Sequence, residues 1–559
     1  MKALPRISLE NKGFYGLLVA IIGLYVAGMG ANSIWTTHES YYAEAVREML
    51  ESKDWLNITF NYEPRLNKPP LTYWLMAVSA WLFGLQEWSL RLPMVLCSLG
   101  TLLLVYRLGT TLYDPQTGRW ALLLMAVSLQ FAWLKHYASP EIPLTFFFTL
   151  TLYGFLQGLL HKKRSYLVAA FSALSLTMLT KGWPYFLIIY AVLAVFLLLH
   201  YRFCLPEIKK IVSFRWFFWG NLCALLVGLS WIIAMYFCSP DYLLEVLHFE
   251  TTQRLARSNQ SSFWRQWFFY PEVILWSFFP GSLVLYYAIY RYLRGGITAI
   301  QPVALPIAWL GVMMLGFTLS QGKLPSYILQ AHPAMALLVA HFIVHPSPKE
   351  LRNRHSEWMY SMLWELPAGA AILGAVILIV AFSLSQVWYF VIGLLIVFRK
   401  VYAHYEWQTP YGAILATLVT LGILFMSLYP SLEYYRPYHT IQQVVKKYPV
   451  PQEVPLVVEN RFIHNLPFYT QRIELRDRKY TWPDILRLGK ETPVLALVDV
   501  RYPLPTGYQM LWQGWLYRKG SESHGFQFIL HCWKARQGDY QHFHHYQLVF
   551  YDPKMPLSK

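Results

Sequence analysis

Charged side chains are scarce in this 559-residue sequence, where Asp, Glu, Lys and Arg together make up 14%. Soluble domains average about a quarter. Hydrophobic residues make up 56% instead, and apolar runs of about 18 residues or more recur at short intervals, as they do in proteins with many membrane-spanning helices. The composition therefore excludes a soluble enzyme, a fibre and a disordered chain.

Cysteine is also rare, and the sequence has no cysteine pair with the spacing of a metal site. The five cysteines are scattered in or beside apolar runs, so we expect free thiols in the core: Cys97, Cys204, Cys223, Cys238 and Cys532. There is no phosphate-binding P-loop, nucleophile elbow or GxGxxG unit, which removes the support for the enzyme classes that depend on them.

The apolar runs predict a polytopic α-helical membrane protein with about thirteen spans. They lie near 14–35, 92–113, 119–139, 142–160, 165–180, 184–200, 216–237, 270–292, 304–321, 326–344, 360–384, 387–403 and 410–430. A further run at 71–85 is short for a span, which needs about twenty residues. It lies in a polar, aromatic loop, so we interpret it as a re-entrant or interfacial helix.

The formal net charge of +17 follows the predicted topology. Lys and Arg cluster in every second loop, for example at Lys162, Lys163 and Arg164, and such loops stay in the cytoplasm. The N-terminus is then cytoplasmic, and residues 433–559 are extracytoplasmic. No small-residue cleavage site follows the first apolar run, which we therefore expect to be an anchor. The topology accounts for the basic charge without nucleic acid.

Several cations in the predicted external loops run against this trend: Lys68, Lys181, Arg254 and Lys323. A Lys or Arg at the membrane interface costs free energy unless it pairs or snorkels. Four such residues from separate loops on one side of the membrane match the needs of a lipid phosphate that becomes a leaving group. Snorkelling at the interface is the alternative interpretation.

Two carboxylates, Glu39 and Glu141, lie at external ends of spans, where either could act as a general base on an acceptor hydroxyl or amine. Ordinary helix-end carboxylates are common, and this is the alternative for both. The large first external loop, 36–88, and the external C-terminal region favour the catalytic interpretation.

Six short motifs occur in order along the chain: HESYYAEAVREML, NKPPLTYW, the turn at Glu141, TKGWP, ETTQRL and GKLPSYIL. In this order they resemble the motifs of bacterial lipid A aminoarabinose transferases and of the wider protein O-mannosyltransferase-like group, which are membrane glycosyltransferases of the GT-C class. The resemblance covers about residues 14–345. It implies a GT-C fold and transfer of a single sugar from a polyprenyl-phosphate donor.

The resemblance also implies roles for individual residues. Lys68, Arg254, Lys323 and Tyr327 match positions that hold the polyprenyl phosphate, and we place Lys181 and Tyr42 with them. The acidic motif of the first loop, normally Asp-Glu, reads His38-Glu39 here. We therefore predict that the catalytic residues are among His38, Glu39 and Glu141, with Glu39 or Glu141 as the base.

The sequence departs from the family pattern at Tyr41, Asn67 and Thr251, where the family has arginine, glutamate and histidine. Some members have a structural metal whose ligands are lost in this way, so we predict no zinc and no cofactor. The same departures indicate a sugar or acceptor other than aminoarabinose and lipid A, although lipid A remains among the candidate acceptors.

The predicted domains are a transmembrane GT-C domain at 1–432 and an extracytoplasmic α/β domain at 433–559. Apolar runs at 454–458 and 492–498 read as buried strands, and 482–488 reads as a helix between them. The histidines at the end of the chain, His542, His544 and His545, could bind a metal, but we interpret them as part of an exposed, partly disordered tail.

The predicted function is transfer of one sugar from a polyprenyl-phosphate carrier to an extracytoplasmic acceptor: lipid A, another envelope glycan or lipid, or a protein. We expect a monomer in the bacterial inner membrane, with no nucleic-acid partner. A transporter or flippase is the rival from another class, but no internal repeat is evident and the charges gather at one membrane face. A polysaccharide polymerase or ligase is a closer rival, which would need a lipid diphosphate donor.

Overall fold

The computed structural model describes residues 11–34, 36–65, 68–241, 244, 263–320, 322–346, 354–384, 409–448, 450–517 and 525–553. The chain divides into two compact units. The helical unit comprises Met1–Ala27, Leu66–Thr72 and Leu92–Leu424, and the sheet unit comprises Gly28–Arg65, Tyr73–Arg91 and Phe425–Lys559.

The helical unit is built from helices that follow one another along the chain. They are α1 (Asn11–Val26), α4 (Glu87–Leu112, which begins in the sheet unit), α5 (Pro115–Val127), α6 (Leu129–Leu134), α7 (Glu141–Leu160), α8 (Arg164–Lys181), α9 (Pro184–His200), α10 (Leu205–Ile211), α11 (Phe214–Gly228), α12 (Ser230–Cys238), α15 (Phe263–Ser277), α16 (Ser282–Arg294), α17 (Gly296–Ile300), α18 (Ala304–Leu319), α19 (His332–Val344), α20 (Arg354–Phe382) and α22 (Thr409–Ile423), with 3-10 turns η2 (Gln301–Val303) and η3 (Pro325–Ala331). The π-helical turn η4 (Leu424–Leu428) joins α22 to the sheet unit.

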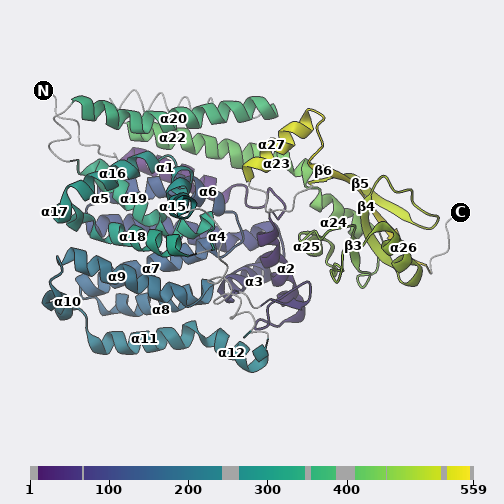
Figure 1. Ribbon diagram of the computed structural model, residues 1–559, viewed down its shortest axis with the longest axis horizontal. Coiled ribbons are helices and arrows are strands. Elements are labelled where there is room, and N and C mark those ends of the chain that lie inside the picture. The colour runs from purple at the N-terminus through teal and green to yellow at the C-terminus, as the bar shows by residue number, and fades with distance from the viewer. Residues whose placement is uncertain are drawn as a thin grey trace. The chain divides into compact units, whose positions relative to one another are not determined.

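Helices α7 and α8 lie side by side, as do α8 and α11 (Figure 1). A glycine allows the first of these approaches, since a Cβ on Gly154 of α7 would come within 2.9 Å of the Cβ of Ala170 on α8. Small residues at such contacts let helix backbones pack closely, which matters in a membrane because lipid provides no hydrophobic drive to bring helices together.

Six helices within the described residues are long and apolar enough to cross a membrane, or seven if the bent pair α10 and α11 forms one span. The predicted number of thirteen is not confirmed by these helices, and the predicted span at 387–403 lies outside the described residues. The predicted short helix at 71–85 is present as α3 (Leu71–Phe83), while its place in the membrane interface stays a prediction.

Three segments that we predicted as continuous spans are broken helices instead. The breaks lie at Ser128 between α5 and α6, at Leu229 between α11 and α12, and at 278–281 between α15 and α16. Two of these breaks are joined by a hydrogen bond. The backbone N–H of Leu129 donates to the carbonyl of Phe279 at 3.1 Å. Backbone groups released from a helix inside a membrane protein need such internal partners.

The sheet unit joins the first predicted loop to the C-terminal region. From the loop come α2 (Thr37–Ser52), the hairpin of β1 (Thr59–Phe60) and β2 (Glu63–Pro64), and most of α3. From the C-terminal region come α23 (Tyr429–Leu432), η5 (Glu433–Tyr435), α24 (Tyr438–Lys447), β3 (Leu456–Val458), α25 (Leu466–Thr470), α26 (Trp482–Glu491), β4 (Val494–Asp499), β5 (Gln509–Tyr517), α27 (Gly525–Arg536) and β6 (Phe543–Tyr551). Asn61 ties the two parts together: its side-chain amide donates to the carbonyl of Glu474 at 3.0 Å and accepts from the N–H of the same residue at 2.8 Å. The predicted domain division near residue 432 stays a prediction.

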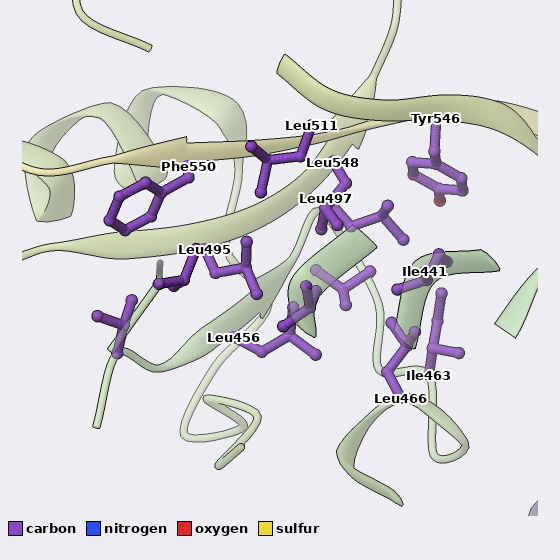
Figure 2. Close-up of a cluster of buried hydrophobic side chains, with 14 of the residues drawn as sticks. Ile441, Leu456, Ile463, Leu466, Leu495, Leu497, Leu511, Tyr546, Leu548 and Phe550 are labelled. Carbon is purple, nitrogen blue, oxygen red and sulfur yellow. The ribbon is translucent and has the colours of Figure 1, made fainter. Parts of the chain in front are cut away.

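Four strands form one sheet in the order β3-β4-β6-β5, with β3 and β4 parallel and the other pairs antiparallel. Strand β4 is buried on both faces, as its unbroken apolar sequence implies. Leu495 and Leu497 face the larger core, which Figure 2 shows packed between the sheet and the neighbouring segments, while Val494, Ala496 and Val498 face the other core. The expected strands and helix are therefore observed as β3, β4 and α26.

The structure corrects two expectations about small groups of residues. His544 and His545 are half-buried in strand β6, which pairs on both sides, so the disordered-tail interpretation is wrong. All five cysteines are free, but only Cys97 and Cys532 are buried. The other three are exposed: Cys204 just before α10, and Cys223 and Cys238 on α11 and α12, which present apolar side chains outward.

Candidate active site

The first element of the candidate site is an ion pair between two neighbouring helices of the helical unit. Glu141 is the first residue of α7, and Lys181 is the last residue of α8. The Lys181 ammonium donates to the Glu141 carboxylate at 3.0 Å, and both side chains are nearly buried. A carboxylate at a helix N-terminus and an ammonium at a helix C-terminus are each favoured by the helix dipole. The sequence therefore predicted two residues that the fold brings into contact.

A row of aromatic rings extends from this pair. The Lys181 ammonium lies 5.0 Å from the centre of the Tyr327 ring, which packs on Phe317 at 5.4 Å between ring centres. Phe317 lies 6.2 Å from Tyr270, whose ring is 5.7 Å from the ammonium of Lys323. Two lysines from separate loops thus flank one row of three rings, and cation–π attraction holds each ammonium there.

The two lysines differ in what else they bind. Lys323 donates to the backbone carbonyls of Phe317 and Thr318 at the end of α18, at 3.2 and 2.5 Å. Lys181 donates one hydrogen bond to Glu141 and has two further N–H groups. Lys181, which lies beside a carboxylate, therefore has two unused donors, and Lys323 has one.

Two predicted phosphate ligands are placed less fully. Lys68 is half-buried just before α3, in the helical unit. Arg254 lies outside the described residues. Their assignment to a lipid phosphate stays a prediction.

Glu39, the other candidate base, is found in the sheet unit on the first turn of α2 and is completely buried. Arg91 pairs with it twice: Nε donates to Oε1 at 2.8 Å, and Nη2 donates to Oε2 at 3.2 Å. The same guanidinium donates to the carbonyls of Met29, Asn32 and Ser33 at 2.8–3.0 Å. Arg91 therefore fastens α2 to the segment that precedes it.

Sequence reasoning missed Arg91. Its signal is a single arginine at the edge of the apolar run that becomes α4, because a charge placed there must find an internal partner. The distance of 52 residues between Arg91 and Glu39 gives the sequence no means of naming that partner.

The remaining predicted residues of the first loop lie close to Glu39. The rings of His38 and Tyr42 are 5.4 Å apart, and Tyr42 stacks on Tyr73 of α3 at 4.5 Å. Tyr42 and Tyr73 are completely buried, whereas His38 is half-buried. The stacking sets the orientation of Tyr42, and the structure leaves its predicted contact with a lipid phosphate untested.

Helix α2 also carries Glu44 and Glu48, and the pKa of Glu48 is shifted from its ordinary value. Burial first, and then the negative charge of Glu44, raise the pKa of Glu48 to about 7. Glu48 accepts a hydrogen bond from the backbone N–H of Tyr62 at 3.0 Å, and Arg47 lies 3.8 Å away. These contacts join α2 to the β1-β2 hairpin.

No group of three or more His, Cys, Asp or Glu side chains that could hold a metal ion occurs in the part of the chain that the structure describes. The residues present there do not fit a structural metal. The prediction of no zinc stays a prediction.

Comparisons with known proteins agree with this architecture. A crystal structure of ArnT from Cupriavidus metallidurans bound to undecaprenyl phosphate superposes with a TM-score of 0.74 over 97% of this chain and 98% of that chain, at 16% identity. The apo form of the same protein gives a TM-score of 0.68 over 88% and 93%. Residues 67–234 match the family described as dolichyl-phosphate-mannose-protein mannosyltransferase. The fold is that of a multi-pass GT-C membrane glycosyltransferase.

Sequence relatives place the chain more closely. An uncharacterized protein of Aquifex aeolicus is 30% identical over 471 residues, which is 84% of this chain and 89% of that protein. The undecaprenyl phosphate-alpha-4-amino-4-deoxy-L-arabinose arabinosyl transferases of Shewanella sediminis and Pseudomonas aeruginosa (strain LESB58) are 26 and 28% identical, over 58 and 59% of this chain. The chain spans 58 and 59% of the length of these two transferases. The chain belongs to the same family as the Aquifex protein, and it is a GT-C glycosyltransferase that resembles the aminoarabinose transferases.

Proposed function

We propose that the protein transfers a single sugar from a polyprenyl-phosphate donor to an extracytoplasmic acceptor. The observation that carries this proposal is the contact of Lys181 with both Glu141 and Tyr327. These residues belong to three separate segments, and they place a cation with spare donors beside a carboxylate and a hydroxyl-bearing ring. The names of the aminoarabinose transferases support undecaprenyl phosphate as the lipid of the donor.

The proposed role of the cations is to stabilise the phosphate of the donor as it leaves. When the bond between the anomeric carbon and the donor phosphate breaks, negative charge grows on the phosphate, and a fixed ammonium stabilises this charge more than it stabilises the ground state. Lys181 and Lys323 are held in place by the aromatic row, and Lys68 and Arg254 complete the proposed set. The phosphate leaves as polyprenyl phosphate, so no nucleotide takes part.

The acceptor side requires a base. As the acceptor oxygen or nitrogen bonds to the anomeric carbon, its proton passes to a carboxylate. Arg91 occupies both oxygens of Glu39, which is completely buried, so we assign the base to Glu141 and a positioning role to Glu39. His38 stands at the position of the missing aspartate, and its catalytic role stays a prediction.

The proposal includes the topology given by the sequence. The chain crosses the bacterial inner membrane about thirteen times as a monomer, with its N-terminus in the cytoplasm. Its C-terminal α/β domain, near 433–559, and its first loop lie in the periplasm, with α3 at the membrane interface. This arrangement puts Glu141, Lys181 and Lys323 on the periplasmic face, where lipid-linked donors are used.

Transfer from a purified donor tests the function. The full-length protein in lipid nanodiscs is given a radiolabelled polyprenyl-phosphate sugar and an envelope extract, and both released polyprenyl phosphate and labelled product are measured. Lys68→Ala and Lys323→Ala should each lower transfer by about 100-fold. Lys209→Ala, which changes an exposed lysine of α10, is the matched control and should transfer normally.

Full transfer by both lysine variants, or use of a lipid diphosphate donor only, would reject the proposal. Separation of the labelled product into lipid, glycan and protein fractions names the acceptor. Label in lipid A or another envelope lipid or glycan is expected, and label in protein would favour an activity of the mannosyltransferase type.

A further inference from the structure

Helix α27 of the sheet unit is apolar on two opposite faces. On the inner face, Phe528 and Cys532 are buried. On the outer face, Phe526 is 76% exposed, Leu530 is 39% exposed and Trp533 is half-buried. These three residues, which we call the outer stripe, are spaced by four and then three positions, so they share one face of the helix. The outer face of a helix in a soluble domain is normally polar, and the outer stripe therefore requires an apolar partner.

Helix α27 is connected through aromatic rings to the end of a membrane-spanning segment. The segment Pro410–Tyr435 is long and apolar enough to cross a membrane, and its end lies in the same unit as α27. The ring of Tyr435 lies 5.2 Å from that of Phe543 on β6, which lies 5.4 Å from the ring of Tyr517 on β5. Tyr517 in turn meets Phe528 of α27 edge-on at 4.9 Å.

Two further contacts place α27 close to this end. The hydroxyl of Tyr517 lies 2.6 Å from Nδ1 of His531, on the inner face of the helix. Arg536, the last residue of α27, is near enough to Tyr435 for its charge to act on the Tyr435 hydroxyl. Figure 1 shows α27 beside α23, the helical turn that directly precedes η5. Helix α27 therefore lies near the point where the membrane segment ends.

The polar residues of this region match a membrane surface. Helix α27 contains no Asp or Glu, and Lys534 and Arg536 in its last turn lie on either side of the outer stripe at 3.6 residues per turn. Tyr434, at the end of the membrane segment, is 70% exposed, and tyrosine is enriched at the boundary between lipid and water. Helices that lie in this boundary combine Phe, Leu and Trp on one side with Lys and Arg toward the headgroups. A second copy of the chain would cover the apolar side chains, but a bilayer with anionic headgroups also matches the two cations.

We propose that α27 binds the surface of the lipid bilayer at which the segment Pro410–Tyr435 ends. The outer stripe lies among the upper parts of the acyl chains, and Lys534 and Arg536 contact anionic headgroups. This contact fixes the sheet unit against the membrane at a point distant in sequence from its first loop. The inference goes beyond sugar transfer, because it rests on the membrane-spanning character of the chain and not on the reaction.

Fluorescence quenching by lipids tests the contact. In the full-length protein the three exposed cysteines are replaced by Cys204→Ser, Cys223→Ser and Cys238→Ser, while the two buried ones stay. Phe526→Cys or Leu530→Cys then carries a nitrobenzoxadiazole label in nanodiscs of phosphatidylcholine and phosphatidylglycerol. The apolar face of an interfacial helix lies about 5–10 Å deep, so lipid with a nitroxide near the top of its acyl chain should quench both labels by at least about twofold.

A label elsewhere in the sheet unit is the matched control. Lys490→Cys, at an exposed position of α26, should show no such quenching. Absence of quenching at positions 526 and 530 would overturn the proposal, as would equal quenching at position 490, which would place the whole unit against lipid. Labels at all three exposed positions leave the core intact, and melting temperatures equal to that of the parent check this.

Light scattering of the unlabelled parent in detergent tests the other occupant. A monomer is expected. A dimer that Leu530→Glu converts into a monomer would assign the outer stripe to a second copy of the chain and would overturn the proposal. Neither measurement needs a sugar donor, so both remain readable whatever the transfer assay gives.

The two cations are tested by the lipid composition. Quenching at position 530 should be stronger with phosphatidylglycerol than with phosphatidylcholine alone, and Lys534→Gln combined with Arg536→Gln should remove this difference. Arg487→Gln combined with Lys490→Gln, a pair of exposed cations on α26, is the matched control and should preserve it. Equal quenching of the parent in the two lipid compositions, or a difference that survives the change of Lys534 and Arg536, would overturn their assignment to anionic headgroups.

Discussion

Each unit contains a glutamate at the start of a helix that is paired with a buried cation, and the two pairs differ in how completely the cation is used. In the sheet unit, Arg91 gives its donors to both oxygens of Glu39 and to three backbone carbonyls. In the helical unit, Lys181 gives one hydrogen bond to Glu141 and otherwise faces the ring of Tyr327.

In the proposed function, this difference separates a structural pair from a functional one. A guanidinium whose donors all have protein partners cannot bind a substrate without breaking those contacts. An ammonium with two spare donors, placed between a carboxylate and a tyrosine, can donate to a phosphate oxygen with little rearrangement. Preorganisation of this kind is what a site for developing charge requires.

Removal of the base should give the largest effect. Glu141→Gln keeps the shape of the side chain but cannot accept the acceptor's proton, so turnover should fall by about 10²–10⁴-fold while donor binding is retained. Glu39→Gln is the matched variant in the other pair, and it should lower stability more than it lowers turnover. Initial rates and melting temperatures of both variants measure this. The reverse pattern would make Glu39 the base.

Loss of Arg91 should come next. Arg91→Ala leaves the buried carboxylate of Glu39 and three carbonyls without their donor, which should lower the free energy of unfolding by about 3–5 kcal/mol. Arg501→Ala, whose side chain is 81% exposed in its pair with Asp499, should change it by no more than about 0.5 kcal/mol. Thermal unfolding in detergent compares the two, and equal melting temperatures would contradict a structural role for Arg91.

Lys181→Ala should lower transfer by about 10²–10³-fold, since it removes the cation beside the leaving phosphate. Lys181→Arg keeps the charge and the pair with Glu141, so it should recover part of the activity. The affinity for polyprenyl phosphate should fall in the alanine variant and largely return in the arginine variant. An alanine variant that loses stability but keeps its rate per folded molecule would place Lys181 with Arg91 as a structural residue.

The smallest expected effect concerns pH and Glu48, a buried acid of the sheet unit. Its pKa is about 7 in the fold and 4.5 ordinarily, so the folded state binds the proton more tightly. Its contribution is fully present below pH 4.5 and is lost as the pH rises to about 7, at a cost of at most about 3 kcal/mol. Glu48→Gln should flatten the stability curve in this range, as melting temperatures from pH 4.5 to 8 would reveal. An unchanged slope would contradict the raised pKa.

Much of the fold could be predicted because hydrophobic periodicity is a local property. The apolar runs marked most of the helices, and the runs at 454–458 and 492–498 marked strands β3 and β4. The helix break at 278–281 has a local signal in Pro280 and Gly281, whereas the break at Ser128 has no such residue and could not be predicted. Hydropathy reads such a pair of broken helices as two continuous spans.

The site could be predicted in part. Motif order pointed to Glu141, Lys181 and Tyr327, which the structure brings together. Glu39 was singled out by the same motifs, and its buried pairing with Arg91 is the reason that we propose it as a positioning residue and not as the base. A motif identifies a residue type at a position, but the residue that donates hydrogen bonds to it can come from a distant part of the chain.

By itself the sequence indicated a membrane protein of many helices, with both helices and strands in its C-terminal region and with cations in the predicted external loops. These properties follow from the hydrophobicity and charge of neighbouring residues. Only the tertiary structure decided which cation has all its donors paired and which loop shares a unit with the sheet. Such outcomes depend on contacts between residues tens to hundreds of positions apart. Hydrogen bonds and ring packing act over a few ångströms in space, whatever the separation of the residues along the chain.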